Sequence, residues 1–240
     1  MKYYLTIDAG TSVIKTVLFN SNHKQINSFS IKNPVITDNF GKSEVDMYNF
    51  WFLTAKCIKL LIQKTKIQSK SIIGVGITAN MVGFWPINSK NKPIRNAILW
   101  NDTRSQKIFT NKKIFNEVYK TTGSIVQYGC TIPILKWISK FEKENFKKIK
   151  YILTCKDWLR FKLTNNIYND ETEVSVFPGN IKEKKLSKKI FKIFRLDTKY
   201  FDLFPEIKKS NDLGGYVTKE ASKITSLKEG TPVIIGCGDV

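Results

Sequence analysis

The sequence predicts an α/β fold built on a mixed β-sheet, and two observations lead to this prediction. The chain begins with three short strand-like stretches joined by tight turns, which is typical of an antiparallel meander. Helical periodicity and β-rich runs then alternate, which is typical of a sheet flanked by helices. With 240 residues, 42% of them hydrophobic, the chain is long enough to bury a full core.

The first strand, which starts at Tyr3, ends in a segment with the composition of a phosphate-binding turn. Asp8 is followed by Gly10, Thr11 and Ser12. We expect Gly10 to adopt a positive φ, and the exposed backbone N–H groups and two hydroxyls to form an anion-binding concavity. Asp8 is expected to hold a hydrated Mg²⁺ ion rather than the phosphate itself. A hairpin whose aspartate only caps the turn remains the structural alternative.

The other elements follow from periodicity and turn residues. The predicted strands are Val13–Phe19, Gln25–Ile31, Ser71–Thr78, Phe84–Ile87, Tyr151–Leu153 and Val233–Ile235, with Ile94–Trp100 extended. The predicted helices are one that starts at Asp46, then Lys107–Lys120, Ile132–Phe146, Lys156–Leu163 and Lys184–Phe194. Asn169–Ser175 is a polar segment.

The net charge of +20 first suggests nucleic-acid binding. The lysines are nevertheless spread along the chain, and their abundance together with Asn and Ile indicates an AT-biased coding sequence. A nuclease on this type of fold needs several converging carboxylates, and only Asp8 is a clear candidate. We therefore expect no specific nucleic-acid partner.

The cysteines and the single histidine limit which catalytic and metal-binding groups the chain can offer. The four cysteines are far apart, so we expect small buried side chains in a reducing cytoplasm rather than metal ligands. His23 lies in a polar segment and is a poor candidate for a catalytic base, which favours carboxylate chemistry. No apolar run approaches the roughly 20 residues that span a bilayer, and the first residues do not match a secretory signal.

The last residues place a second carboxylate at a strand end. Val233–Ile235 is followed by Gly236, Cys237, Gly238 and Asp239, where glycines allow a ligand to approach the backbone closely. A solvated aspartate at a strand end is the structural alternative. Because the chain stops one residue later, we expect it to be part of a longer architecture.

Together, these segments resemble the N-terminal domain of the FGGY family of carbohydrate kinases, in the family's order and over essentially the whole chain. The matching segments are Ile7–Lys15, Gly41 with Glu44, Asp46 and Trp51, Gly76–Gly83, Ala97–Arg104, Gly129–Pro133 with Lys136 and Trp137, Lys156–Arg160, Asp170–Ser175 and Gly230–Asp239. The similarity is greatest to the xylulose, pentulose and polyol kinase-type members.

The resemblance implies a ribonuclease H-like fold, shared with actin, for residues 1–240 as one N-terminal domain. It implies phosphoryl transfer from ATP, with Mg²⁺, to a sugar or polyol hydroxyl. The chain would be the sugar-binding half and inactive alone, because most of the nucleotide pocket belongs to a C-terminal domain that this chain lacks. The expected partners are therefore the sugar and that domain, and a homodimer is left open. A degenerate sugar- or phosphate-binding module without turnover is the alternative function.

The resemblance also assigns residue roles. Asp239 matches the catalytic base, Asp8 the carboxylate on the metal side, and Gly10 and Thr11 the turn around the γ-phosphate. The substrate-side positions are Met81, Val82, Trp100, Asn101 and Asp102. Trp100 as a core residue and Asp102 as a helix cap are the structural alternatives.

Substrate choice depends on Met81 and Val82. Glycerol kinases carry Arg-Glu at these two positions, so glycerol is disfavoured. Xylulose kinases carry Met-His, so Met81 fits and Val82 departs. We expect a ketopentose or a four- to five-carbon polyol.

Overall fold

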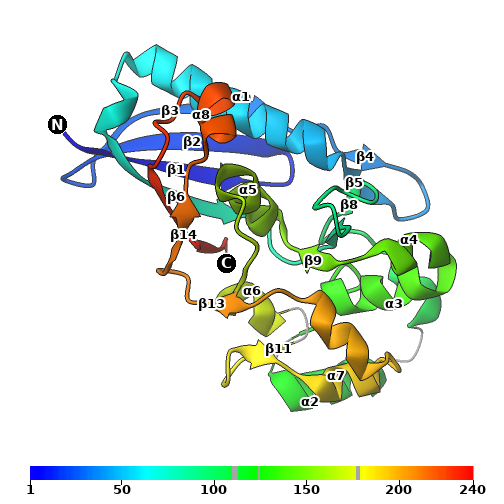
Figure 1. The fold of residues 1–240 in the computed structure, drawn as a ribbon. Helices are drawn as coiled ribbons and strands as arrows, with labels where there is room; N and C mark the ends of the chain where they lie inside the picture. Colours follow the sequence, from blue (N-terminus) through cyan, green and yellow to red (C-terminus); the bar gives the residue numbers. More distant parts are fainter. Residues whose placement is uncertain (110–112, 124, 177–178, 240) are drawn as a thin grey trace.

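The computed structural model describes residues 1–109, 113–123, 125–176 and 179–239, and its centre is a seven-stranded mixed sheet (Figure 1). The strand order is β14-β15-β6-β1-β2-β3, and β16 also pairs with β6. The strands are β1 (Tyr3–Ala9), β2 (Val13–Asn20), β3 (Gln25–Lys32), β6 (Ile72–Ala79), β14 (Leu213–Tyr216), β15 (Pro232–Ile234) and β16 (Cys237–Gly238). The predicted α/β architecture and antiparallel start are confirmed.

The sheet register brings the two candidate carboxylates to one edge. β1 pairs in parallel with β6, with Asp8 opposite Thr78. β16 pairs in parallel with the same strand, with Cys237 opposite Thr78 and Gly238 opposite Ala79. Because all three strands run in the same direction, their carboxyl ends open on the same side of the sheet.

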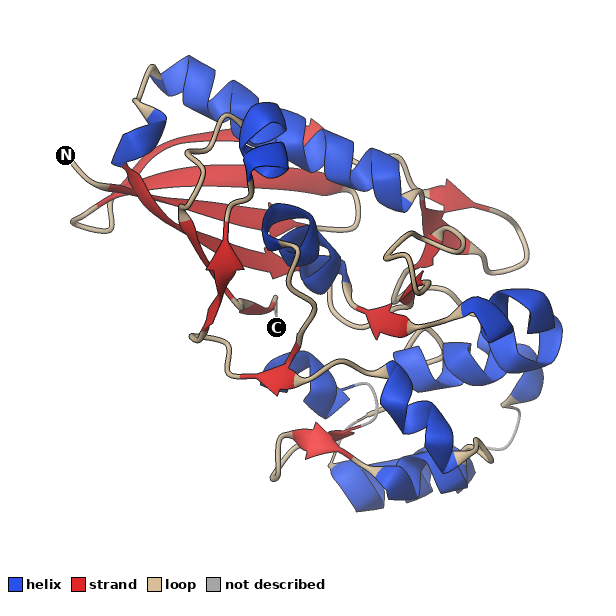
Figure 2. Ribbon diagram, in the orientation of Figure 1, coloured by secondary structure: helices blue, strands red, loops and turns tan. Residues whose placement is uncertain are grey.

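Three helices, α1 (Met47–Thr65), α5 (Cys155–Thr164) and α8 (Lys219–Thr225), cover one face of this sheet (Figure 2). The Asp46 side chain caps α1 by accepting a 2.7 Å hydrogen bond from the Asn49 N–H, as expected for a helix starting there. Alternate residues of β1 point into one apolar core with the buried faces of the three helices.

A second, mainly helical part lies beside the sheet and has its own apolar core (Figure 1). Its helices are α2 (Lys113–Thr122), α3 (Thr131–Phe141), α4 (Lys143–Lys148), α6 (Glu171–Val176) and α7 (Lys188–Ile193), with the 3-10 turns η2 (Arg104–Ile108) and η3 (Thr198–Leu203). Short strands link the parts: β4 (Ile36–Thr37), β5 (Ser43–Val45), β7 (Trp85–Ile87), β8 (Ala97–Ile98), β9 (Tyr151–Leu153), β10 (Asn169–Asp170), β11 (Gly179–Asn180), β12 (Lys185–Leu186) and β13 (Ile207–Lys208). A further 3-10 turn, η1 (Ser69–Ser71), precedes β6.

Three predicted helices differ from the structure. The helix predicted at 107–120 starts later, because its first residues belong to η2; residues 110–112 lie outside the described part of the chain. The helix predicted at 132–146 breaks at Glu142, whose backbone leaves the helical region and whose carboxylate accepts a hydrogen bond from Asn145 in the next turn. The helix predicted at 184–194 is shorter, because Lys184 has a φ of +51° and Lys185 and Leu186 pair with β11.

Other expectations need correction too. The polar segment 169–175 contains helix α6, in which Glu173 is buried with a raised pKa and Glu171 pairs with Lys184. Cys237 is exposed, whereas the other three cysteines are buried as expected. The elements η3, β14 and α8 were not predicted from the sequence. None of the described helices combines the length and apolarity that a bilayer crossing demands.

Candidate active site

A pocket of about 420 Å³ lies where β1, β6 and β16 end against the helical part. It is lined by Thr11, Asn80, Met81, Val82, Trp100, Ile125, Gln127, Cys130 and Asp239. The structure thus brings together five predicted site residues that are up to 228 positions apart in the chain (239 minus 11). A concave, largely apolar site with a few polar groups is the usual form of a small-molecule site.

Asp239 sits at the mouth of this pocket because the chain turns sharply before β16. Gly236 has a φ of +83°, and a Cβ atom there would lie 2.2 Å from the Ile77 carbonyl oxygen, so only glycine fits. Burial raises the pKa of the Asp239 carboxyl, and the negative charge of Asp8 raises it further, although hydrogen bonds from its own N–H and from that of Met81 oppose both effects. Asp8 is exposed at the end of the neighbouring strand.

The turn after β1 is held from two sides. Asn33 donates hydrogen bonds to the carbonyl oxygens of Thr11 (2.7 Å) and Ser12 (2.8 Å), and the Trp100 Nε1–H donates to the Thr11 hydroxyl at 2.9 Å. The positive φ expected at Gly10 is wrong. Glycine suits this position for a different reason, because a Cβ atom would lie only 3.0 Å from the Val13 carbonyl oxygen.

Met81 and Val82 form the wall of the pocket next to Asp239. Val82 has a φ of +53°, a left-handed conformation that β-branched residues rarely adopt. Its N–H donates a 2.8 Å hydrogen bond to Oε2 of Glu173 in α6. The backbone at this wall is therefore hydrogen-bonded to a buried carboxyl group that lies outside the pocket lining.

Trp100 forms the opposite wall, and with 42% of its surface exposed it is not a core residue. Asn101 and Asp102 border an adjoining pocket that shares Trp100 and Gln127 with the first one. The Asn101 side-chain oxygen accepts a 2.7 Å hydrogen bond from the Ser43 hydroxyl.

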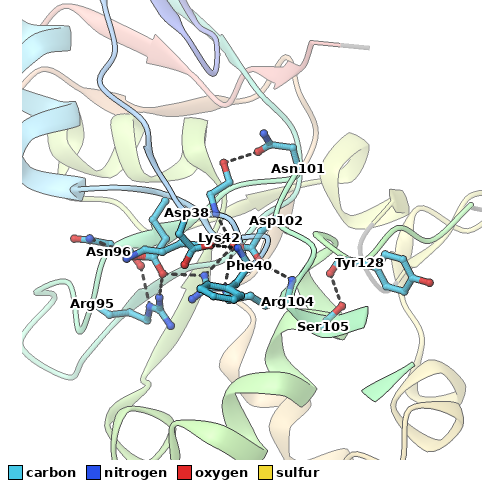
Figure 3. A network of polar contacts seen from close by, with 12 residues as sticks. Asp38, Phe40, Lys42, Arg95, Asn96, Asn101, Asp102, Arg104, Ser105 and Tyr128 are labelled. Atoms are coloured by element: carbon cyan, nitrogen blue, oxygen red, sulfur yellow. Dashed lines mark hydrogen bonds and ion pairs between the residues drawn. The ribbon is translucent and has the colours of Figure 1, made fainter. Parts of the chain in front are cut away.

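Asp102 is fully buried in a polar network (Figure 3). It accepts hydrogen bonds from the Ser43 N–H at 2.8 Å and the Arg104 N–H at 2.9 Å, and it pairs with the Arg104 guanidinium at 2.8 Å. Glu44 binds the same guanidinium at 2.8 Å. The N-cap position of η2 is Thr103 and not Asp102, whose carboxylate accepts a hydrogen bond from the Arg104 N–H two residues further on.

A second group of ionised side chains lies behind the pocket, at the start of α5 and in β10. Lys156 contacts Asp157 at 2.9 Å and Asp170, and Arg160 contacts Asp157 at 2.9 Å. Burial opposes ionisation of Asp157, yet Lys156 and Arg160 hold its pKa below the usual range. Glu173 adjoins this cluster, and burial raises its pKa to about 8 despite the attraction of Lys156.

Sequence reasoning missed several pocket residues. Asn80, Gln127 and Cys130 line the pocket, and Glu173 supports it from behind. Asn80, Cys130 and Glu173 fall in segments that resemble the family, so those segments carried the available signal. Within the part of the chain that the structure describes, no three His, Cys, Asp or Glu side chains are grouped to hold a metal ion.

The fold is similar to that of solved sugar-kinase structures. The chain superposes with a TM-score of 0.90 on a xylulose kinase from Lactobacillus acidophilus, at 23% identity and covering 100% of this chain and 48% of that one. A glycerol kinase from Plasmodium falciparum superposes with a TM-score of 0.85 at 24% identity, over 100% of this chain and 49% of that one. These likenesses show the ribonuclease H-like fold.

The family follows from the sequence comparisons. The profile of the FGGY family of carbohydrate kinases, N-terminal domain, matches residues 3–240, and the chain belongs to this family. It is 35% identical to a Haemophilus influenzae protein described as "Probable L-xylulose kinase", covering 100% of this chain and 50% of the relative. It is 31% identical to the xylulose kinase of Bacillus subtilis, covering 100% of this chain and 48% of the relative. The chain therefore spans about half the length of these curated relatives.

Proposed function

We propose that this chain is the sugar-binding half of an ATP-dependent carbohydrate kinase that acts on a ketopentose or a four- to five-carbon polyol. The observation that carries the proposal is the placement of Asp8 and Asp239 at the ends of two strands that both pair with β6, with Asp239 and Thr11 lining one pocket. Family membership and the names of the relatives support the substrate class.

In this proposal Asp239 is the general base that takes the proton from the attacking hydroxyl. The pKa of Asp239 is raised, and a carboxylate with a higher pKa is a stronger base. The turn of Gly10, Thr11 and Ser12 binds the phosphoryl group while it is transferred to the sugar hydroxyl. The Trp100–Thr11 hydrogen bond fixes one side of this turn.

A Mg²⁺ ion fits this arrangement through Asp8. Such ions are commonly held by one or two carboxylates together with the substrate's phosphates, which agrees with an exposed carboxylate and no larger ligand group among the described residues. When bound, the ion would neutralise charge that develops on the phosphoryl oxygens.

The sugar would occupy the pocket between Met81 and Val82 on one wall and Trp100 on the other. Apolar walls bury the carbon skeleton, and the polar groups of Asn80, Gln127 and Asp239 are available to its hydroxyls. For Asn101 and Asp102, which border the adjoining pocket, contact with the sugar stays a prediction.

The remaining half of the kinase would supply most of the ATP site. Since the chain spans about half of its relatives, we propose that further sequence or a second chain completes the enzyme, that residues 1–240 alone do not turn over ATP, and that the reaction takes place in the cytoplasm. The native mass tests this: an antibody to this chain should detect a band near twice 27.7 kDa, or a co-purifying second chain. A lone 27.7 kDa band would contradict it.

Calorimetric titration of the 240-residue chain tests the sugar site. We expect D- or L-xylulose, or a five-carbon polyol, to bind more tightly than glycerol. Absence of binding to the folded chain would contradict the sugar site, and a preference for glycerol would contradict the substrate class. The alternative, a binding module without turnover, predicts sugar binding but no phosphorylation once the nucleotide-binding half is present.

A further inference from the structure

Two adjacent residues of α6 hold the backbone of the Met81–Val82 wall and of the strand end that carries Asp239. The Thr172 hydroxyl accepts a 2.9 Å hydrogen bond from the Gly238 N–H, and Glu173 Oε2 accepts the 2.8 Å bond from the Val82 N–H. Gly238 directly precedes Asp239, and Val82 directly follows Met81. Helix α6 therefore hydrogen-bonds to the peptide that precedes the candidate base Asp239 and to a peptide in the Met81–Val82 loop.

The Met81–Val82 loop and the Gly238–Asp239 strand end also contact each other. A Cβ atom on Gly238 would lie 2.5 Å from the Met81 Sδ atom, and the Met81 N–H lowers the pKa of the Asp239 carboxyl. Consecutive amides of one loop thus act on two different carboxyl groups: that of Met81 on Asp239 in the pocket, and that of Val82 on Glu173 behind it. Movement of the Val82 peptide would therefore move the neighbouring Met81 amide relative to Asp239.

The backbone conformation of Val82 explains why its N–H needs the hydrogen bond to Glu173. A φ of +53° is unfavourable for a β-branched residue unless the surroundings fix it. The Glu173 hydrogen bond is a local contact that fixes it, and Val82 is one of the pocket-lining residues. Without this bond, the loop is expected to relax toward ordinary backbone angles and to change the shape of the pocket.

The surroundings of Glu173 favour its neutral form, although the hydrogen bond from the Val82 N–H acts in the opposite direction. The side chain is fully buried, and the charged or titratable groups that act on it or are acted on by it are Lys156, Asp157, Asp170, Cys130 and Cys155. Lys156 and Arg160 already balance Asp157 and Asp170, so an ionised Glu173 would add an uncompensated negative charge. A pKa of about 8 leaves Glu173 mainly protonated at neutral pH.

We propose that Glu173 and Thr172 are positioning residues, which hold the Met81–Val82 loop and the Gly238–Asp239 strand end against each other and thereby set the affinity for the sugar. This inference rests on the proposed sugar site, because it assigns a supporting role to residues outside the pocket lining. It extends that function to α6, which contributes no residue to the lining of the pocket.

The variants Glu173→Gln, Glu173→Leu and Thr172→Val test the proposal, with Glu171→Gln as the matched control. Glu171 lies in the same helix but pairs with exposed Lys184, so its variant should behave like the wild type. Glutamine keeps a neutral acceptor oxygen for the Val82 N–H, whereas leucine leaves that buried N–H unsatisfied.

The first readout is the amide NMR spectrum of the sugar-free 240-residue chain. We expect the Met81, Val82 and Gly238 resonances to keep their positions in the Glu173→Gln and Glu171→Gln variants at pH 6.5 and to shift in the Glu173→Leu variant. Unshifted Met81 and Val82 resonances in the folded leucine variant would overturn the inference. This readout does not depend on which sugar binds.

The second readout is the Kd for xylulose, measured below the unfolding temperature of each variant. We expect the Kd to rise about tenfold or more in the Glu173→Leu variant and about threefold in the Thr172→Val variant, and to return to within about twofold with glutamine. If the leucine variant does not fold, the isosteric Thr172→Val variant, which loses the contacts of the hydroxyl with both the Gly238 N–H and Asp170, is judged by the Gly238 amide resonance together with the Kd. A wild-type Kd in the folded variants would overturn the inference, whereas a wild type that binds no sugar would overturn the proposed function instead.

Discussion

Two groups of acidic side chains flank the pocket, and they differ in almost every physical property. Asp157, Asp170 and Glu173 are fully buried and bound to lysine, arginine or backbone N–H groups. Asp8 and Asp239 are exposed at strand ends, and Asp239 lines the pocket. The comparison shows that burial and partners decide whether a carboxylate holds the fold together or is available for chemistry.

The largest expected effect follows from breaking the buried group. In Lys156→Met, Asp157 and Asp170 lose a buried partner, so we expect the free energy of unfolding to fall by about 3–5 kcal/mol. Urea denaturation measures this change. Lys147→Met is the control, because Lys147 and Glu144 form an exposed pair whose loss should leave the midpoint unchanged. Equal effects of the two changes would contradict the distinction.

A smaller effect concerns the pH dependence of stability. Burial raises the pKa of Glu173 from 4.5 to about 8 in the folded chain, so the folded state holds a proton that the unfolded state loses. Its contribution to stability is therefore complete below pH 4.5 and is lost as the pH rises toward 8, with a slope of up to about 1.4 kcal/mol per pH unit.

Urea midpoints measured at intervals between pH 5 and pH 9 would test this dependence. Glutamine has no proton to lose, so the Glu173→Gln variant should lack the Glu173 part of the slope. Identical pH profiles for the wild type and this variant would show that Glu173 does not titrate in this range.

The smallest effect on stability is expected in the exposed group. Asp8→Asn should change the free energy of unfolding by less than about 0.5 kcal/mol, because Asp8 is exposed and not part of the buried network. The same variant should lower the pKa of Asp239, since the charge of Asp8 raises it. Carboxyl NMR titration of Asp239 measures the shift, and an unchanged pKa would indicate that the two carboxylates do not interact.

The elements that could be predicted from the sequence are those whose structure depends on residues close together in the chain. The meander of β1, β2 and β3, the helix capped by Asp46 and strand β6 follow from alternation, capping and apolar periodicity. Helix α6 was not predicted because its sequence is polar, and the burial of Glu173 depends on contacts with residues distant in sequence, such as Val82. The break at Glu142 was not predicted either; the Glu142 carboxylate contacts Asn145 in the next turn and Arg95, which is distant in sequence.

The candidate site was predictable where a residue's place depends on a strand end. The resemblance to the family assigned Asp8, Thr11 and Asp239 to one site, and the structure supplies the physical reason, because the parallel strands that precede them end on one side of the sheet. The left-handed backbone of Val82 and its hydrogen bond to Glu173 could not be predicted from the local sequence, because valine rarely adopts a positive φ. The roles of these residues in catalysis and binding remain predictions.

The most direct test of the central claim is ATP-dependent phosphorylation of xylulose by the complete kinase that contains this chain, compared between the wild type and Asp239→Asn. We predict that the wild type is active and that the variant, while remaining folded, loses about 10²–10⁴-fold in rate, as expected for removal of a general base. A folded Asp239→Asn variant that phosphorylates xylulose at the wild-type rate would contradict the assignment of Asp239 and the site built around it.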